Sequence, residues 1–238
     1  MDRRSTDRTA PLLVLWDIDH TLVDIGTVGR RSYAVAFQRA TGRPLTESWQ
    51  FAGRTEPAAA AEVLRLHGFD PGDGLLTAFL ELVVAELTGR AAELAAEGRV
   101  LPGAAAALAA LGDRPGVRQS VLTGNLHPLA VLKLDALGLS DRLDLRLGAF
   151  GDDAVERTEL PAHAFDRAER VLGHRFRGGD TVIIGDTPRD VATALAVGAR
   201  SVAVATGLSP AAELAAAGAH VVLPDLADTE AVLRAVLG

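Results

Sequence analysis

The stretch LLVLWDIDHTL, from Leu12 to Leu22, constrains the fold more than any other part of the chain. Its apolar residues run directly into Asp17 and Asp19, and Thr21 follows two places later. A short apolar run rich in branched residues predicts a strand that is buried on both faces. If the strand geometry continued, side chains at alternate positions would bring both acids and Thr21 to one side. A charged turn after a strand explains one acid but poorly explains two, because buried carboxylates are costly unless a cation or a reaction uses them.

The remaining chain divides into a helical tract and an alternating tract. Residues 24–98 show only helical patterns, one of them a long helix over about 72–97. From residue 99 onward, strand patterns such as VRQSVLTGN, RLDLRLGAF, DTVIIGD, RSVAVATG and AHVVLPD alternate with helical ones. Such alternation with short links predicts a parallel sheet covered by helices on both faces. We therefore predict an α/β protein with a Rossmann-like parallel-sheet core, residues 1–23 and 99–238, and an inserted all-helical cap, residues 24–98.

Composition excludes several classes of function. The net charge of -7 argues against nucleic acid or an anionic membrane surface as a partner, since both favour a basic protein. The chain has no cysteine, which excludes disulfides, thiolate metal sites and cysteine nucleophiles. No apolar run reaches the roughly 18 residues that span a bilayer, and the charged stretch MDRRSTDRTAP indicates a loose tail rather than a signal. We expect a cytoplasmic protein, and the oligomeric state is not indicated.

Polar residues follow three of the predicted strands. The first strand leads into Asp17 and Asp19, the strand SVL leads into 123–125 (Thr-Gly-Asn), and TVIIG leads into Asp186, with Asp190 four residues later. Ligands of open parallel sheets bind beyond the carboxyl ends of the strands. We therefore expect these segments, which are distant in sequence, to form one site.

This combination of residues indicates chemistry on a phosphate ester. Magnesium is usually held by one or two carboxylates and substrate phosphate oxygens, and Asp17 and Asp186 would supply that charge. A carboxylate can then act as a nucleophile and form an aspartyl phosphate. A second carboxyl group two residues later, at Asp19, could protonate the leaving alkoxide and then activate water. Thr123 and Gly124 would donate hydrogen bonds to the phosphoryl oxygens.

The segments Asp17-Ile18-Asp19-His20-Thr21, Thr123-Gly124-Asn125 and Gly185-Asp186-Thr187-Pro188-Arg189-Asp190 resemble motifs one, two and four of the haloacid dehalogenase superfamily. Their order and spacing resemble the subgroup whose helical cap follows motif one, which includes phosphoglycolate-phosphatase-like enzymes. One such motif is a weak signal, whereas three in order at strand ends are specific. The resemblance covers nearly the whole chain.

The resemblance implies a magnesium-dependent phosphatase of small phosphorylated metabolites that works through an aspartyl phosphate. Asp17 would be the nucleophile, Asp19 the general acid and base, and Thr123 the phosphoryl hydrogen-bond donor, with Gly124 and Asn125 binding substrate. Asn125, like Thr21 in motif one, is equally well explained as a turn residue.

The resemblance also implies a magnesium site. Asp17, Asp186 and the backbone carbonyl of Asp19 would bind the ion, with Asp190 assisting. Asp190 has a second explanation, because Thr187 at the N-cap position and an acid three residues later nearly form a capping box. The two roles of Asp190 are compatible.

The third motif of the family, normally a lysine on a helix after motif two, is altered here. The chain has one lysine, Lys133. It lies about eight residues into the helix after Asn125, roughly 12 Å along the axis from the phosphate end, so we expect it to be solvated. Arg157 stands where the motif is expected, and an arginine can grip a pair of oxygens. We predict that Arg157 takes the place of the lysine, the alternative being an ordinary surface arginine.

The predicted cap should choose the leaving group by closing over the core. Arg54, in the loop FAGRTEP, is the cap residue that we predict to contact substrate, although a surface arginine beside a helix is an equal alternative. Asp24 and Gly26 would form part of the hinge. His20 replaces the glycine that is common in motif one, and a loop residue at the entrance is its simplest explanation.

Three other functions remain open. Haloacid dehalogenases proper share the fold but need no second acid at the position of Asp19, so that residue favours phosphoryl transfer. A phosphomutase would use the same core. A non-catalytic regulatory module that binds a phosphate ligand would be expected to have lost an acid, yet Asp17, Asp19, Asp186 and Asp190 are all present.

Overall fold

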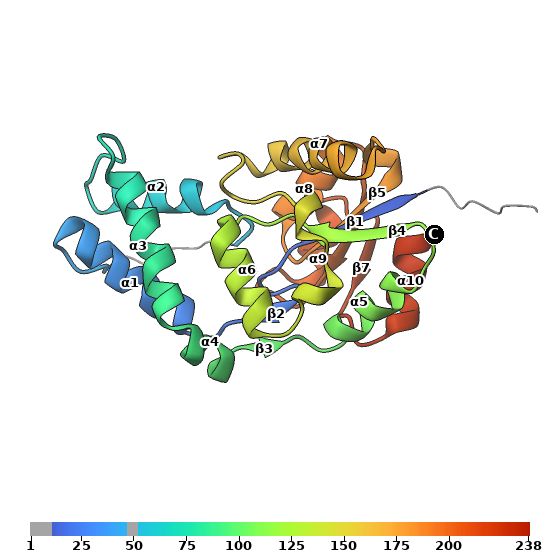
Figure 1. Cartoon of the computed structure of the whole chain (residues 1–238), viewed down its shortest axis with the longest axis horizontal. Helices are drawn as coiled ribbons and strands as arrows, with labels where there is room; N and C mark the ends of the chain where they lie inside the picture. The colour runs from blue at the N-terminus through green and yellow to red at the C-terminus, as the bar shows by residue number, and fades with distance from the viewer. Residues whose placement is uncertain (1–10, 47–51) are drawn as a thin grey trace, which may run out of the picture.

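A computed structural model describes residues 11–46 and 52–238 of the chain (Figure 1). A five-stranded parallel sheet in the order β4-β1-β5-β6-β7 forms its centre. The strands are β1 (Leu12–Trp16), β4 (Val117–Val121), β5 (Thr181–Gly185), β6 (Arg200–Val204) and β7 (Val221–Leu223). The predicted α/β class with a parallel sheet is confirmed. The first strand of the sequence, β1, lies between β4 and β5 and is therefore an inner strand of the sheet.

Helices cover both faces of the sheet. They are α5 (Ala104–Gly112), α6 (His127–Ala136), α7 (Leu160–Leu172), α8 (Pro188–Ala196), α9 (Ala211–Ala216) and α10 (Thr229–Leu237). Alternate side chains of β1 point to opposite faces of the sheet. Val14 and Trp16 pack in one apolar cluster with residues of α5 and α10, whereas Leu13 and Leu15 pack in another with residues of α7. This explains why β1 is apolar throughout.

Four helices, α1 (Val28–Thr41), α2 (Glu56–Leu66), α3 (Leu75–Gly89) and α4 (Ala91–Glu97), form a helical block beside the sheet (Figure 1). The block has an apolar cluster, in which the rings of Phe37 and Phe79 lie 5.6 Å apart, and this cluster extends to Leu126 and Leu129 at the start of α6. A short antiparallel ribbon of β2 (Val23–Asp24) and β3 (Arg99–Val100) flanks it. The predicted boundaries between core and cap fall in this ribbon, and the division of the chain there stays a prediction. No described helix is long and apolar enough to cross a membrane.

The single long helix predicted over about 72–97 is wrong. The structure has two helices, α3 and α4, which meet at Arg90. Arg90 leaves the helical conformation with φ -108° and ψ 22°, and its side chain donates to the carbonyl of Glu86 at 3.0 Å. Gly89, just before the break, is a poor helix former. The apolar pattern runs through both helices and hides the break.

The strand predicted from RLDLRLGAF is also wrong. This segment holds a 3₁₀ turn, η2 (Leu145–Leu147), and only Ala149 forms a strand-like bridge, with Leu122. The side chain of Asp144 accepts a hydrogen bond from the backbone N–H of Arg146 at 3.2 Å, which favours a turn over an extended chain. Three other 3₁₀ turns are η1 (Ser140–Arg142), η3 (Arg157–Glu159) and η4 (Gly178–Asp180).

Candidate active site

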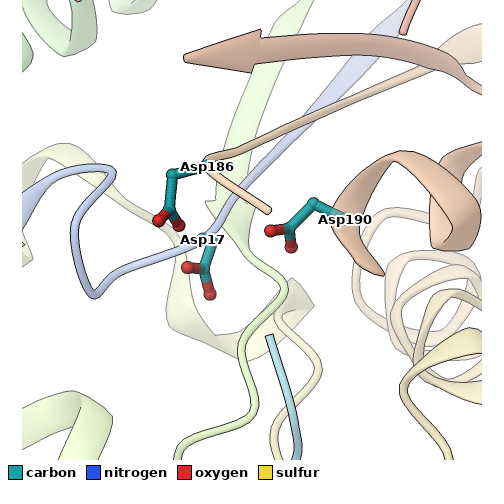
Figure 2. A group of neighbouring side chains, drawn as sticks. All are labelled: Asp17, Asp186 and Asp190. Carbon is teal, nitrogen blue, oxygen red and sulfur yellow. The ribbon is translucent and has the colours of Figure 1, made fainter. Parts of the chain in front are cut away.

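The carboxyl ends of β1, β4 and β5 bring the predicted motifs together. Asp17 follows β1, Thr123 lies beyond β4, and Asp186 follows β5. Carboxylate oxygens of Asp17, Asp186 and Asp190 all lie within 4.8 Å of one another, and all three residues are buried. Figure 2 shows the three carboxyl groups close together, with that of Asp190 turned toward the other two. The expected meeting of these distant acids is thus observed.

Burial and the neighbouring negative charges disfavour the ionised forms of Asp17 and Asp186. Burial raises the pKa of Asp17 to about 7, and the charge of Asp190 adds to the rise although Arg157 opposes it. Burial also raises the pKa of Asp186 to about 8, with the charges of Asp17 and Asp190 adding to it. A compact set of buried oxygen donors with excess negative charge fits a hard divalent cation such as magnesium.

Asp190 is held in place by the start of α8. Its Oδ2 accepts hydrogen bonds from the backbone N–H of Thr187 at 3.0 Å and from the Thr187 hydroxyl at 2.6 Å, so the capping box is present. A Cβ at Gly185 would lie 2.2 Å from the Asp190 carboxyl carbon. Only glycine at position 185 therefore allows Asp190 to approach the other acids so closely.

Arg157 lies inside this acidic group. Its guanidinium Nη2 donates to Oδ1 of Asp17 at 2.8 Å, to Oδ1 of Asp190 at 2.5 Å and to the carbonyl of Leu122 at 3.2 Å. The side chain is only 6% exposed, which excludes the alternative of a surface arginine. Its Nε is buried without a hydrogen-bond partner among the described residues. The position fits the predicted replacement of the family's lysine, and the catalytic role stays a prediction.

The expectation that Lys133 is solvated is wrong. Its side chain is 6% exposed, and Nζ donates to Oδ1 and Oδ2 of Asp19 at 2.8 and 2.7 Å and to Oδ1 of Asn125 at 2.6 Å. Lys133 lies on the buried face of α6 with Leu129 and Leu134. Side chains on a helix lean toward its N-terminus, so the long lysine reaches back to the phosphate end.

Asn125 connects Lys133 to the rest of this network. Its Nδ2 donates to Oδ2 of Asp19 at 2.7 Å and to Oγ1 of Thr123 at 2.8 Å. Burial by itself would raise the pKa of Asp19, but the charge of Lys133 and the hydrogen bonds from Lys133 and Asn125 hold that pKa below its usual value. Asp19 is therefore kept ionised beside the buried Thr123.

Residues of the motif-one turn lie at the edge of the site. The hydroxyl of Thr21 donates to Oδ1 of Asp186 at 3.4 Å, a long bond that still brings Thr21 to the acids. His20 is exposed and has φ 58°, a conformation that favours glycine. At the predicted hinge, Asp24 accepts from the backbone N–H of Gly26 at 2.9 Å and pairs with Arg99 at 2.5 Å.

The helical block touches the core at Gly124. A Cβ at Gly124 would lie 1.9 Å from the carbonyl oxygen of Arg54, so the close approach requires glycine. The Arg54 guanidinium forms an ion pair with Glu62 of α2 and is one third exposed. The backbone N–H of Glu56 donates to the carbonyl of Gly124 at 2.8 Å. Glu56 was not predicted as a site residue, because an acid in the first turn of a helix is ordinary.

Comparisons with known proteins identify the family of this chain. A family model described as haloacid dehalogenase-like hydrolase matches residues 14–195. A phosphoglycolate phosphatase from Rhodospirillum rubrum is 37% identical over 130 residues, which are 54% of this chain and 50% of that protein. The chain thus matches about half the length of this relative.

Two solved structures illustrate the likeness in fold. A hydrolase from Pseudomonas syringae has a TM-score of 0.71 at 21% identity, covering 94% of this chain and 98% of that one. The protein CbbY from Rhodobacter sphaeroides, in complex with phosphate, has a TM-score of 0.70 at 22% identity, covering 91% and 95%. At these identities the likeness establishes a shared fold.

Proposed function

Because the chain belongs to the haloacid dehalogenase-like hydrolase family, we propose that it is a magnesium-dependent phosphatase of small phosphorylated metabolites. The observation that carries this proposal is the meeting of three buried carboxylates, Asp17, Asp186 and Asp190, with Arg157 bonded to the first. The partial match to a phosphoglycolate phosphatase supports the same class of reaction. The substrate itself is a small phosphate monoester in this proposal.

The proposed metal site uses Asp17 and Asp186, the backbone carbonyl of Asp19 and assistance from Asp190. When bound, the magnesium ion supplies positive charge that lowers the repulsion between a carboxylate and a phosphate dianion. Arg157 adds a permanent positive charge at the same place, because a guanidinium does not lose its proton in proteins. Burial makes both contributions stronger than they would be in water.

In the first half of the proposed reaction, Asp17 attacks phosphorus through a carboxylate oxygen. Because the negative charge of a bound phosphate opposes that of the Asp19 carboxylate, Asp19 takes up a proton when the substrate binds. The bond between phosphorus and the leaving oxygen then breaks, and Asp19 gives that oxygen its proton. Thr123 and the backbone N–H of Gly124 hold the phosphoryl oxygens. The product on the protein is an acyl phosphate at Asp17.

In the second half, Asp19 acts as a base. It takes a proton from a water molecule, whose oxygen attacks phosphorus and releases inorganic phosphate, so that Asp17 is regenerated as a carboxylate. The network of Lys133 and Asn125 keeps Asp19 oriented toward the site. Asp19 is 34% exposed, so both water and a leaving group can reach it.

The alternative functions differ from the proposed phosphatase in what they release: a phosphatase forms the acyl phosphate at Asp17 and then hydrolyses it to inorganic phosphate. A phosphomutase would pass the phosphoryl group from Asp17 to a substrate hydroxyl and release no phosphate. A haloacid dehalogenase would expel halide with no use for Asp19. A binding module would retain the fold and release neither product.

Hydrolysis of p-nitrophenyl phosphate with and without magnesium tests the proposal. Wild type should turn over only with the metal, and Asp17→Asn should lose essentially all turnover because it removes the nucleophile. Asp113→Asn, a change at an exposed aspartate, is the matched control and should behave as wild type. Absence of metal-dependent phosphate release from this ester and from a panel of phosphorylated metabolites would contradict the proposal.

A further inference from the structure

The first residues of α2 place a carboxylate where the helical block meets the catalytic core. The hydroxyl of Thr55 donates to the carbonyl of Val155 at 2.6 Å, and the backbone N–H of Glu56 donates to the carbonyl of Gly124 at 2.8 Å. Gly124 is one of the residues proposed to hold the phosphate. The start of α2 is therefore anchored on both sides to the loops around the site.

The Glu56 side chain has an unsatisfied oxygen. Its Oε2 is buried and has no hydrogen-bond partner among residues 11–46 and 52–238. Burying a hydrogen-bond acceptor without a donor costs free energy, and native proteins rarely contain a buried acceptor that lacks a partner. Burial raises the pKa of Glu56 to about 7, and the charges of Lys133 and Asp19 act on the same group. Glu56 therefore lies within electrostatic reach of the acid/base residue.

The donors of the neighbouring network are already used. The ammonium of Lys133 donates to both oxygens of Asp19 and to Asn125, which accounts for its three hydrogens. The amide of Asn125 donates to Asp19 and to Thr123, which accounts for its two. A donor for Glu56 must then come from outside this network.

The position of Glu56 indicates which molecule supplies that donor. Asp19 is proposed to protonate the leaving oxygen of the substrate, so the remainder of the leaving group lies on the side of the helical block. An acid at position 56 could act only by stabilising the N-terminus of α2 through the helix dipole. That role, however, does not require a carboxylate oxygen that is buried and unpaired. An occupant that carries a hydrogen-bond donor explains it.

We propose that Glu56 is a specificity residue that selects phosphate monoesters whose leaving group carries a hydrogen-bond donor, above all an ammonium group. The inference rests on the proposed phosphatase function. A leaving group with a carboxylate, such as that of phosphoglycolate, would meet the like charges of Glu56 and Asp19. The chain would therefore differ in substrate preference from the relative that it matches over half its length.

The test compares three esters of similar length: 2-aminoethyl phosphate, 2-hydroxyethyl phosphate and phosphoglycolate. Phosphate release is measured with magnesium at about pH 8, above the pKa of about 7 of the Glu56 carboxyl, so that the group is ionised. The proteins are wild type, Glu56→Gln and Glu81→Gln, the last being a change at an exposed glutamate of α3 in the same helical block. Melting temperatures check that all three are folded, and p-nitrophenyl phosphate reports phosphatase activity by itself.

Wild type should prefer the amine to the carboxylate by roughly tenfold or more in kcat/KM, with the hydroxyl ester between them. Glu56→Gln should reduce that ratio severalfold, and Glu81→Gln should keep it. Three outcomes would overturn the inference: equal use of the three esters, a preference for phosphoglycolate, or an unchanged ratio in folded Glu56→Gln. In each case, hydrolysis of p-nitrophenyl phosphate would still support the proposed phosphatase function. Failure of wild type on every ester would overturn both.

Discussion

Two buried cations, Arg157 and Lys133, pair with different acids at the edge of the sheet. Arg157 lies between Asp17 and Asp190, and these three side chains are 6%, 9% and 2% exposed. Lys133 is equally buried at 6%, but its partner Asp19 is 34% exposed. We call the first group the Arg157 cluster and the second, with Asn125, the Lys133 cluster.

The difference in exposure fits a difference in task. A nucleophile and its counter-charges work best away from water, where electrostatic stabilisation is strong. A general acid and base must exchange protons with a leaving group and with water, so it needs an open side. In the proposed mechanism, Arg157 therefore neutralises the negative charges of Asp17 and the phosphate, a role that a lysine usually has in the family. Lys133 holds the acid/base residue instead.

The largest effect should follow from Arg157→Met. It removes a charge proposed to stabilise the transferring phosphoryl group, so kcat/KM should fall by about a thousandfold or more. It also leaves Asp17 and Asp190 buried without their partner, which should lower the free energy of unfolding by about 3–5 kcal/mol near neutral pH. Steady-state kinetics and urea unfolding measure the two effects.

Lys133→Met is the matched comparison for Arg157→Met, since it removes the other buried cation. We expect it to reduce turnover less, because its partner Asp19 can be solvated. If Lys133→Met abolished turnover while Arg157→Met retained it, the assignment of charge neutralisation to Arg157 would be wrong.

Magnesium should stabilise the protein in a pH-dependent way by binding to the group of Asp17, Asp186 and Asp190. The folded pKa values of Asp17 and Asp186, about 7 and about 8, lie above the ordinary 3.8, so the folded state binds the proton more tightly than the unfolded state. Without metal, the free energy of unfolding should therefore fall as pH rises from about 4 to about 8. Metal competes with these protons, so magnesium should raise the melting temperature more at high pH than at low pH.

Thermal melting at about pH 6 and about pH 8, with and without magnesium, checks this expectation. Asp186→Asn should lose most of the magnesium effect, and Asp113→Asn should keep it. An equal or larger magnesium shift at the lower pH would speak against metal binding by these acids.

A moderate effect is expected from Lys133→Met on the pH profile. Lys133 holds the pKa of Asp19 below its usual value, so its removal should raise that pKa. Since Asp19 must be ionised to take a proton from water, the acidic limb of kcat should move to higher pH. Lys133→Arg, which keeps the charge, should restore much of the original limb. An unmoved limb in Lys133→Met would show that Lys133 does not tune Asp19.

The smallest effect is expected from Arg54→Ala. Arg54 belongs to neither cluster, pairs with Glu62 and is one third exposed. If it contacts substrate as predicted, its loss should raise KM a few-fold and leave kcat nearly unchanged, as for uniform binding. A large fall in kcat would mean that a third cation, Arg54, takes part in the chemistry, so that the Arg157 and Lys133 clusters would not account for catalysis by themselves.

Much of the site was predictable because parallel strands end at a common edge. Asp17, Thr123 and Asp186 each follow an apolar run, and the sheet order places β1 between β4 and β5. The position of Arg157 was predicted from the resemblance to the family, and its burial among the acids agrees with that prediction.

The contact between Lys133 and Asp19 was not predicted, and two features of the structure explain why. Both acids would lie on one side only if strand geometry continued past Asp17, but β1 ends at Trp16, and the following turn contains His20 with φ 58°. The turn allows Asp17 to meet Arg157 and Asp19 to meet Lys133. Distance along the helix axis also overstates the distance of Lys133 from the site, because a lysine side chain leans toward the helix N-terminus. The apolar spacing of Leu129, Lys133 and Leu134 was the available signal, since a cation on a buried face needs a buried partner.

Covalent trapping of the phosphoryl group tests the central claim most directly. Asp19→Asn, which lacks the base for the second step, is mixed with magnesium and p-nitrophenyl phosphate, quenched in acid and analysed by peptide mass spectrometry. The account predicts one phosphoryl group on the peptide that contains Asp17, and none in Asp17→Asn. Wild-type phosphate release with no phosphoryl group on Asp17 in the trapped variant, or with the group on another residue, would contradict it.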